Sequence, residues 1–372
     1  MKVEFKTTDV LPKLTQVASV INAKSNLLVL MSVCITIKGD SVIITASDGE
    51  TWITERAGII SSEEDCVFCV NAQDILKCLR TLDDVTVTMT FDDEKKILTC
   101  DYGKGKMNMP YSVADDFPRP VLNMDEAGEL VVASDTVLKA IELTRTAIAS
   151  DDLRPIMNGI HFDFANGNMM CCSCNFYKMV RFCNEINSEL TGNFTLPQKT
   201  TSLIQSVLSS FNDDVKIRFT DKAISVSNQN FKITSRLLEG DYPNVNFLVP
   251  KETIAKVYVS NDDMVQALKH VLSVYNNGAF VQLTFKDGEI VINAEDFNFS
   301  KSATETVPCK YESEDEFSIC FNGDMLIDLL KNIDNDTVVF EMIHPEKPAM
   351  LYSNGEMNVS QYLSLIMPMK LN

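Results

Sequence analysis

Three histidines are the first residues to test for catalysis, because imidazole is the commonest acid–base group near neutral pH. His161, His270 and His344 lie far apart in the chain, and none has a nucleophile or a second histidine at a spacing typical of an active site. Gly103-Lys-Gly105 is half of a glycine-rich loop, but it falls in a predicted hairpin and no Lys-Ser/Thr pair follows it. The sequence therefore predicts that the protein is not an enzyme of these types.

Cysteines and paired aspartates are the residues that could hold a metal ion. Cys66-Val-Phe-Cys69 has CxxC spacing, but the pattern predicts a strand, which places the two thiols on opposite faces. Cys171-Cys-Ser-Cys174 is also strand-like, and no histidine pair or second CxxC follows it. The pairs Asp115-Asp116, Asp151-Asp152 and Asp213-Asp214 lie at predicted turns and domain edges, where such carboxylates normally face water. We expect reduced, mostly buried thiols, no metal and no cofactor.

The composition is typical of a soluble globular protein. The 372 residues are 45% hydrophobic and 23% charged, and the chain is long enough for two or three domains. The longest apolar runs fall far short of the roughly 20 residues that cross a bilayer, and the N-terminus lacks a secretion signal, so we expect a cytoplasmic protein without membrane contact. The formal net charge of -19 repels DNA phosphates at long range. Either DNA is not a partner, or something other than net attraction holds it.

The strongest pattern in the sequence is a threefold repeat. A short strand, a break and an amphipathic helix recur around Asn71, Pro197 and Asn322, which are 126 and 125 positions apart. A second marker has the same period: a strand leads into a helix with Thr, Ser, Asn or Asp at the predicted N-cap. Its reference positions, 127 and 127 residues apart, are Leu11, Leu138 and Val265. Two independent markers with one period indicate three related domains.

Between these helices the chain is rich in short strands of alternating hydrophobicity. Ser41–Thr45, Gly159–Phe164 and Phe280–Phe285 are examples, and hairpin turns that contain glycine join several of them. Each third is therefore predicted to be an α+β domain with two helices packed on antiparallel sheet. Proline and turn residues cluster at Asp116–Pro120 and Asp241–Asn244. We expect three domains, at residues 1–120, 128–248 and 254–372.

The order of these features resembles the bacterial DNA polymerase III beta subunit family along the whole chain. Met367-Pro-Met-Lys-Leu371 is similar to the family's terminal Met-Pro-Met-Arg-Leu, and Leu238-Glu-Gly-Asp-Tyr-Pro243 resembles its Asp-Gly-x-Φ-Pro junction. Ala114–Pro118 resembles the earlier junction, and Met157-Asn-Gly-Ile160 a strand of the middle domain. Cys174-Asn-Phe-Tyr-Lys-Met179 departs from the family's Thr-Asp-x-His-Arg/Lys-Leu. This departure leaves open whether the protein accepts the family's standard peptide.

The resemblance implies a head-to-tail homodimer whose repeated clamp domains close into a ring, with helices lining the hole. Such a sliding clamp, or processivity factor, encircles duplex DNA without sequence preference and catalyses nothing. A closed ring is retained topologically, so the negative net charge is no obstacle. The residues predicted to face DNA are Lys24, Lys77, Arg80, Lys139, Arg145, Arg154, Lys199 and Lys269, with Lys13 and His270 on the same predicted helices.

The resemblance also implies a peptide-binding groove between the middle and C-terminal domains. Through it the clamp would tether the replicative DNA polymerase, the clamp loader and repair proteins, since adaptable Met and Leu side chains accept several short apolar motifs. Its predicted wall consists of Met157, Cys174, Phe176, Tyr177, Lys178, Met179, Pro243, Phe247, Leu248, Asn322, Met325, Leu365, Ile366, Met367, Pro368 and Met369. The predicted dimer interface joins Met107 and Met109 of one subunit to Leu272 of the other. Ordinary core packing is the alternative for both sets.

Two other functions stay open at this point. The altered Cys174–Met179 stretch suggests a clamp-like scaffold that binds proteins but no longer encircles DNA. A repeat-built, metal-dependent nuclease would instead hold its metal with carboxylates, and a chelator-sensitive activity would favour it. Retention on circular DNA that is lost on linear DNA separates the clamp from both.

Overall fold

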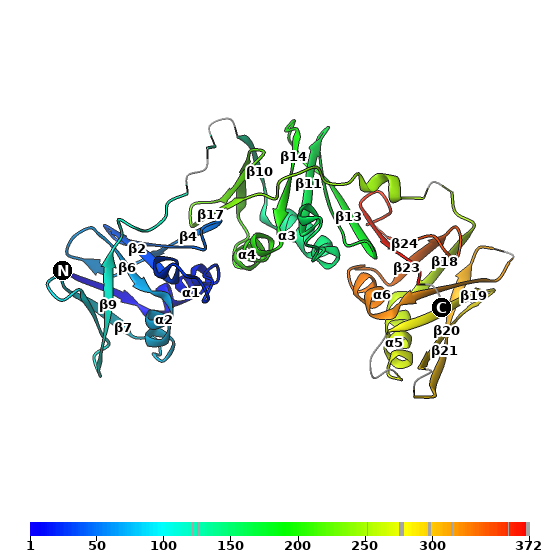
Figure 1. Cartoon of the computed structure of the whole chain (residues 1–372), viewed down its shortest axis with the longest axis horizontal. Coiled ribbons are helices and arrows are strands. Elements are labelled where there is room, and N and C mark those ends of the chain that lie inside the picture. The colour runs from blue at the N-terminus through cyan, green and yellow to red at the C-terminus, as the bar shows by residue number, and fades with distance from the viewer. Residues whose placement is uncertain are drawn as a thin grey trace. The chain divides into compact units, whose positions relative to one another are not determined.

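The structure of the protein is a computed structural model. It describes residues 1–120, 123–124, 127–250, 252–274, 279–296, 299–313, 315–355 and 357–369. The chain forms two compact units: unit 1 consists of Met1–Leu138 and Ser202–Leu237, and unit 2 of Lys139–Thr201 and Leu238–Asn372. Figure 1 traces the elements of both units along the sequence. In the described part of the chain, no helix is long and apolar enough to span a membrane.

One order of elements occurs three times, as the sequence repeat predicted: a strand, a helix, a group of strands, a second helix and three more strands. The first copy contains β1 (Lys2–Lys6), α1 (Thr7–Ala18), η1 (Leu28–Met31), β2 (Ser32–Lys38), β3 (Ser41–Ser47), β4 (Thr51–Gly58), β5 (Ser61–Ser62), β6 (Cys66–Asn71), α2 (Ala72–Arg80), β7 (Thr86–Asp92), β8 (Ile97–Asp101) and β9 (Lys106–Val113).

The second and third copies repeat this order. The second contains β10 (Gly128–Ala133), α3 (Ser134–Thr144), η2 (Arg145–Ala147), η3 (Pro155–Met157), β11 (Gly159–Ala165), β12 (Asn168–Cys174), β13 (Lys178–Glu185), β14 (Gly192–Pro197), α4 (Gln198–Leu208), β15 (Asp214–Phe219), β16 (Ala223–Ser227) and β17 (Phe231–Arg236). The third contains η4 (Val245–Leu248), β18 (Ala255–Ser260), α5 (Asn261–Leu272), β19 (Phe280–Lys286), β20 (Glu289–Asp296), β21 (Lys301–Tyr311), β22 (Phe317–Asn322), α6 (Gly323–Leu330), β23 (Thr337–Met342), β24 (Ala349–Ser353) and β25 (Tyr362–Ile366).

The sheets continue from one repeat into the next within each unit. In unit 1 the strand order is β10-β15-β16-β17-β4-β3-β2-β6-β9-β8-β7-β1-β5, and in unit 2 it is β14-β11-β12-β13-β25-β24-β23-β18-β21-β20-β19-β22. The repeats therefore join where β17 pairs antiparallel with β4, and where β25 pairs antiparallel with β13. Within unit 1, α1 packs against α2, and within unit 2, α5 packs against α6 (Figure 1). The predicted α+β architecture is confirmed.

Side-chain caps fix where several helices begin. Asn71 Oδ1 accepts hydrogen bonds from Gln73 and Asp74 N at the start of α2, and Asn322 and Ser260 cap α6 and α5 in the same way. The polar N-cap predicted for α1 is wrong, because Lys6 occupies the cap without a side-chain bond. Thr7 Oγ1 instead donates to the carbonyl of Asp83, 2.7 Å away, so the hydroxyl ties α1 to a loop.

The cysteines lie in the strands and helices as free thiols. All eleven are unbridged, and Cys171, Cys172 and Cys174 are buried side by side along β12. Burial raises the pKa of Cys172 to about 12, which leaves it a neutral thiol. The prediction of buried, reduced thiols holds for this cluster. Across the described residues, no three His, Cys, Asp or Glu side chains gather closely enough to hold a metal ion.

Candidate functional site

Unit 2 carries a group of exposed apolar side chains that come from three segments. We define the apolar patch as Phe176, Tyr177, Phe247, Leu248, Met367 and Met369. Phe247 is 87% exposed and Phe176 is 45% exposed, although side chains of this size are normally buried. The segments are the β12–β13 turn, η4 and the chain after β25. An exposed cluster of aromatic, Leu and Met side chains indicates a surface that binds another protein.

Two backbone hydrogen bonds hold the chain after β25 against the rest of unit 2. Met367 N donates to the carbonyl of Tyr177, 2.8 Å away in the β12–β13 turn, and Met369 N donates to the carbonyl of Cys320 in β22, also 2.8 Å away. The segment therefore bridges the middle and third repeats, with the Met367 and Met369 side chains left exposed. Lys370 and Leu371 of the terminal motif lie outside the described residues.

Side-chain hydrogen bonds hold η4 beside β13. Asn244 Oδ1 accepts from Asn246 N at the start of η4, and Asn246 Oδ1 in turn accepts from the Arg181 guanidinium of β13 at 3.0 Å. Val245 is buried among Met179 and Leu365. With Val245 fixed inside, the following Phe247 and Leu248 side chains remain exposed at the surface.

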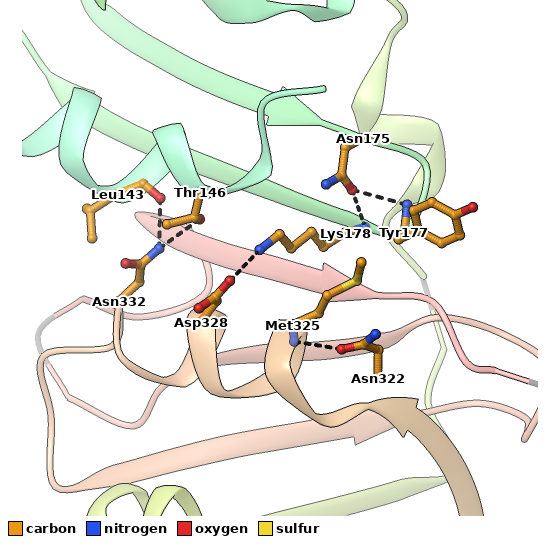
Figure 2. A network of polar contacts seen from close by, with 9 residues as sticks. All are labelled: Leu143, Thr146, Asn175, Tyr177, Lys178, Asn322, Met325, Asp328 and Asn332. Atoms are coloured by element: carbon orange, nitrogen blue, oxygen red, sulfur yellow. Dashed lines mark hydrogen bonds and ion pairs between the residues drawn. The ribbon is translucent and has the colours of Figure 1, made fainter. Parts of the chain in front are cut away.

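Polar contacts join α6 to the middle repeat below the patch (Figure 2). Lys178 Nζ lies 3.1 Å from Asp328 Oδ2; the lysine is only 6% exposed, whereas the aspartate is 54% exposed. Asn332, just after α6, donates to the carbonyl of Leu143 at 3.0 Å and to Thr146 Oγ1 at 3.1 Å. The first contact ties α6 to the start of β13, beside the turn that carries Phe176 and Tyr177, and the other two tie the end of α6 to α3 and η2.

The sequence-predicted wall residues divide into surface and interior groups. The six side chains of the apolar patch and Pro243 are exposed, while Asn322, Met325 and Pro368 are half-buried. The interior residues are Met157, Cys174, Lys178, Met179, Leu365 and Ile366. Met157, Cys174, Met179 and Leu365 belong to one buried cluster, which supports the exposed side chains from inside. These four residues are buried, and their contact with a peptide stays a prediction.

Sequence reasoning missed three residues of this region. Asp328 and Asn332 are polar residues of α6 and its end, and only the fold brings them to Lys178 and Leu143. Arg154 was assigned to DNA, but its guanidinium lies 5.3 Å from the centroid of the Phe176 ring. No local pattern could reveal these long-range pairs. Lys178 begins β13 and is buried, and a buried lysine needs an acidic partner, but the sequence alone does not show this burial.

The eight residues predicted to face DNA are all exposed, whereas Lys13, which lies on one of the same predicted helices, is not. Lys24, Lys77, Arg80, Lys139, Arg145, Arg154, Lys199 and Lys269 are exposed. Lys13 makes two contacts within unit 1. Its Nζ lies 3.1 Å from Oε2 of the fully buried Glu55 and 4.4 Å from the centroid of the Phe211 ring. Its charge is therefore neutralised within the protein. His270 Nδ1 lies 3.0 Å from Glu305 Oε2.

The predicted dimer-interface residues differ in burial. Met107 is exposed, as an interface side chain on a separate subunit must be. Met109, two residues further along β9 and on the same face, is only 4% exposed because it packs into the core of unit 1, and its place in the interface stays a prediction. Leu272 is half-buried, and a Cβ added to Gly323 would lie 2.9 Å from its methyl groups, so it packs on the start of α6.

Comparison with known proteins assigns this architecture to a class. Three repeats of two helices on antiparallel sheet, joined by continuous sheet edges, define the three-domain bacterial clamp. Models of the DNA polymerase III beta subunit match the N-terminal domain at residues 1–125, the central domain at 131–244 and the C-terminal domain at 246–370. The chain belongs to the DNA polymerase III beta subunit family. It is a sliding clamp, a non-catalytic processivity subunit, and the nuclease alternative is set aside.

Individual relatives agree with this assignment. The beta sliding clamp of Staphylococcus aureus strain Mu50 is 25% identical over 275 residues, which cover 72% of this chain and 71% of the relative. The beta sliding clamp of Staphylococcus epidermidis gives the same identity and coverage. Among solved structures, the sliding clamp of Pseudomonas aeruginosa bound to griselimycin has a TM-score of 0.93, and the beta subunit of Thermotoga maritima 0.90. Both are 20% identical and match over 100% of each chain, so they establish the fold.

Proposed function

We propose that the protein acts as a head-to-tail homodimer that encircles duplex DNA and tethers the replicative polymerase through the apolar patch. The observation that carries this proposal is the way the repeats join. The third strand of the group between the two helices, β4 or β13, pairs with the final strand of the next repeat, β17 or β25. The equivalent strands of the outermost repeats are β21 and β9. Pairing β21 of one copy with β9 of another would extend the same rule and close a ring.

The edges of these two strands support this interface. Lys106–Pro110 of β9 pairs with β8 on one side, and in the described chain no strand pairs with it on the other. Residues 301–308 of β21 likewise pair only with β20 among the described strands. An unpaired strand edge is a template for another chain. Replacing exposed Met107 by Asp should give monomers by light scattering; a persistent dimer would exclude this surface.

Enclosure reconciles the acidic chain with a DNA partner. At a net charge of -19 the protein cannot hold DNA by general attraction, whereas a closed ring needs only a basic lining. The exposed basic residues Lys77 and Arg80 on α2, Lys139 on α3 and Lys269 on α5 are candidates for that lining. The test is retention on nicked circular DNA and release when the circle is cut. Equal loss from both would favour the scaffold that no longer encircles DNA.

The apolar patch is suited to weak, exchangeable docking of short peptides. Burying ~300 Å² of apolar ligand surface gives on the order of 7 kcal/mol before costs. Ordering a flexible peptide offsets several kcal/mol, which leaves an affinity of about micromolar strength. Such affinity allows polymerase, clamp loader and repair proteins to exchange. Deleting residues 367–372 should abolish polymerase stimulation and leave the dimer intact; normal processivity from this truncation would refute the docking assignment.

A further inference from the structure

The β12–β13 turn has the same hydrogen bonds as the β3–β4 turn but a different residue at its centre. Asn175 Oδ1 accepts from Tyr177 N at 3.2 Å and Lys178 N at 2.9 Å. Asp48 Oδ1 accepts from the N atoms of the two equivalent residues, Glu50 and Thr51, at 3.0 and 2.8 Å. Asn175 and Asp48 therefore occupy equivalent positions, and the two turns have the same pattern of side-chain to backbone hydrogen bonds.

The central residue of both turns has a left-handed backbone. Gly49 has φ +95°, which glycine adopts without strain. Phe176 has φ +70°, where a bulky side chain is a conformational outlier. Glycine would serve this turn better, yet an aromatic ring is held there and left 45% exposed. A strained residue with an exposed side chain suggests a binding role, because strain of this kind is concentrated at ligand sites.

Arg154 adds a charged group to the same place. Its guanidinium carbon lies 5.3 Å from the Phe176 ring centroid, so the cation packs on the ring while much of the ring stays open. Within the part of the chain that the structure describes, no carboxylate pairs with Arg154. This exposed guanidinium is therefore available to receive a carboxylate from a bound peptide.

We propose that Phe176 and Arg154 form a specificity-determining subsite of the apolar patch, which takes a peptide carrying both an aromatic and an acidic side chain. The aromatic side chain packs on the open part of the Phe176 ring, in an offset or edge-to-face arrangement. The carboxylate pairs with the Arg154 guanidinium. This inference rests on the proposed peptide docking, and it adds a selectivity that Gly49 could not supply in the matching turn.

The test measures selectivity with short fluorescein-labelled synthetic peptides by polarisation. One set carries a Phe and an Asp at varied separation in an Ala/Leu background; matched sets replace Phe by Leu, or Asp by Asn. The full-length protein should bind the best Phe/Asp peptide about tenfold more tightly than either counterpart. Phe176→Gly should remove the preference for Phe, Phe176→Tyr should keep it, and Arg154→Gln should remove the preference for Asp.

Controls separate this subsite from general effects on folding. Phe176→Gly should leave the thermal midpoint unchanged or raise it, because glycine suits φ +70°. Phe299 is an exposed phenylalanine elsewhere in unit 2 with Lys301 Nζ 5.8 Å from its ring centroid, so Phe299→Gly is a matched variant that should keep both preferences. Equal binding of Phe and Leu peptides by the unaltered protein would overturn the subsite alone. No binding of any peptide would overturn the docking function with it.

Discussion

The junction of β4 with β17 in unit 1 and the junction of β13 with β25 in unit 2 share one backbone arrangement. Arg236 N donates to the carbonyl of Glu50 at 3.0 Å in the first, and Met367 N donates to the carbonyl of Tyr177 at 2.8 Å in the second. In unit 1 the Arg236 and Glu50 side chains form an ion pair of 3.1 Å. In unit 2 the equivalent Met367 and Tyr177 side chains are exposed apolar groups. One backbone arrangement thus carries a surface ion pair in unit 1 and an exposed apolar surface in unit 2.

The interiors of the two junctions also differ in charge: the interior is charged in unit 1 and apolar in unit 2. Glu55 of β4 is buried opposite Phe231 and paired with Lys13, whereas the equivalent position of β13 is Phe182, opposite Tyr362. Unit 1 therefore has charge both at the surface and inside its junction. Unit 2 has an apolar junction interior and an apolar surface beside it. The same backbone arrangement therefore accommodates either paired charges or apolar side chains, and the proposed peptide docking uses the second.

Transferring the charge pair to unit 2 should have the largest effect. The double variant Tyr177→Glu with Met367→Arg would imitate Glu50 and Arg236, keep the backbone bonds and remove apolar contact area. We expect peptide affinity to fall by about 3 kcal/mol, roughly a hundredfold in Kd. Polymerase-peptide titration measures it. The reciprocal variant, Glu50→Tyr with Arg236→Met, should leave this affinity unchanged; retained binding by the first variant would break the comparison.

Breaking the buried Lys13–Glu55 ion pair of unit 1 should have the next largest effect. Lys13→Met leaves Glu55 without its cation inside the junction, at a cost of about 3 kcal/mol in the free energy of unfolding at neutral pH. Burial already raises the pKa of Glu55, against the opposing effect of Lys13. The loss should therefore shrink as pH falls and the carboxyl group becomes protonated. Urea titrations at several pH values test this, and Glu55→Gln in the Lys13→Met background should restore part of the stability.

Removing Asp328 should have a smaller effect in unit 2. Asp328→Ala leaves the buried Lys178 ammonium unpaired, but water reaches the exposed end of this ion pair and reduces the cost. We expect a loss of about 1–2 kcal/mol in the free energy of unfolding. Lys178→Met combined with Asp328→Ala should recover much of it, since no buried charge then remains. An unchanged stability in Asp328→Ala would mean that the pair does not hold α6.

The smallest expected effect concerns the pH response of unit 2. The His161 ring stacks on Tyr242 with centroids 4.7 Å apart, and its Nδ1 lies 3.1 Å from Thr195 Oγ1. Burial lowers the pKa of His161, against the Asp163 carboxylate, which raises it. A folded pKa below the unfolded value means that stability is lost as pH falls below about 6.5, by up to about 1 kcal/mol. His161→Gln should flatten this dependence in denaturant titrations; an identical slope would remove His161 as its source.

The sequence predicted what depends on local patterns. The period around Asn71, Pro197 and Asn322 revealed the repeats, because caps and amphipathic helices are encoded by nearby residues. It did not reveal that Met109 is buried while Met107, on the same face of β9, is exposed, because the extent of the core along a strand depends on tertiary packing. Lys13 likewise looked like a solvent-facing cation until the fold brought Glu55 to it.

The candidate site was predictable in membership but not in arrangement. The terminal motif Met367–Leu371 and the hairpin around Phe176 gave most of the patch through family resemblance. Which members are exposed depends on pairing between β13 and β25, strands that are far apart in the sequence. The left-handed backbone at Phe176 was also hidden, because the sequence there has no glycine to signal it.

The pairing of β4 with β17 has a consequence for biosynthesis. Glu55 pairs with Phe231, so the ribosome must add 176 residues after Glu55, up to and including Phe231, before this partner exists. At bacterial elongation rates this takes ~10–35 s, during which the outer edge of the first repeat presents unpaired amide and carbonyl groups. Exposed strand edges attract other nascent chains on the same messenger. The β4 edge, like the β13 edge whose Phe182 pairs with Tyr362, is therefore a segment for which holding by a ribosome-associated chaperone should matter during translation.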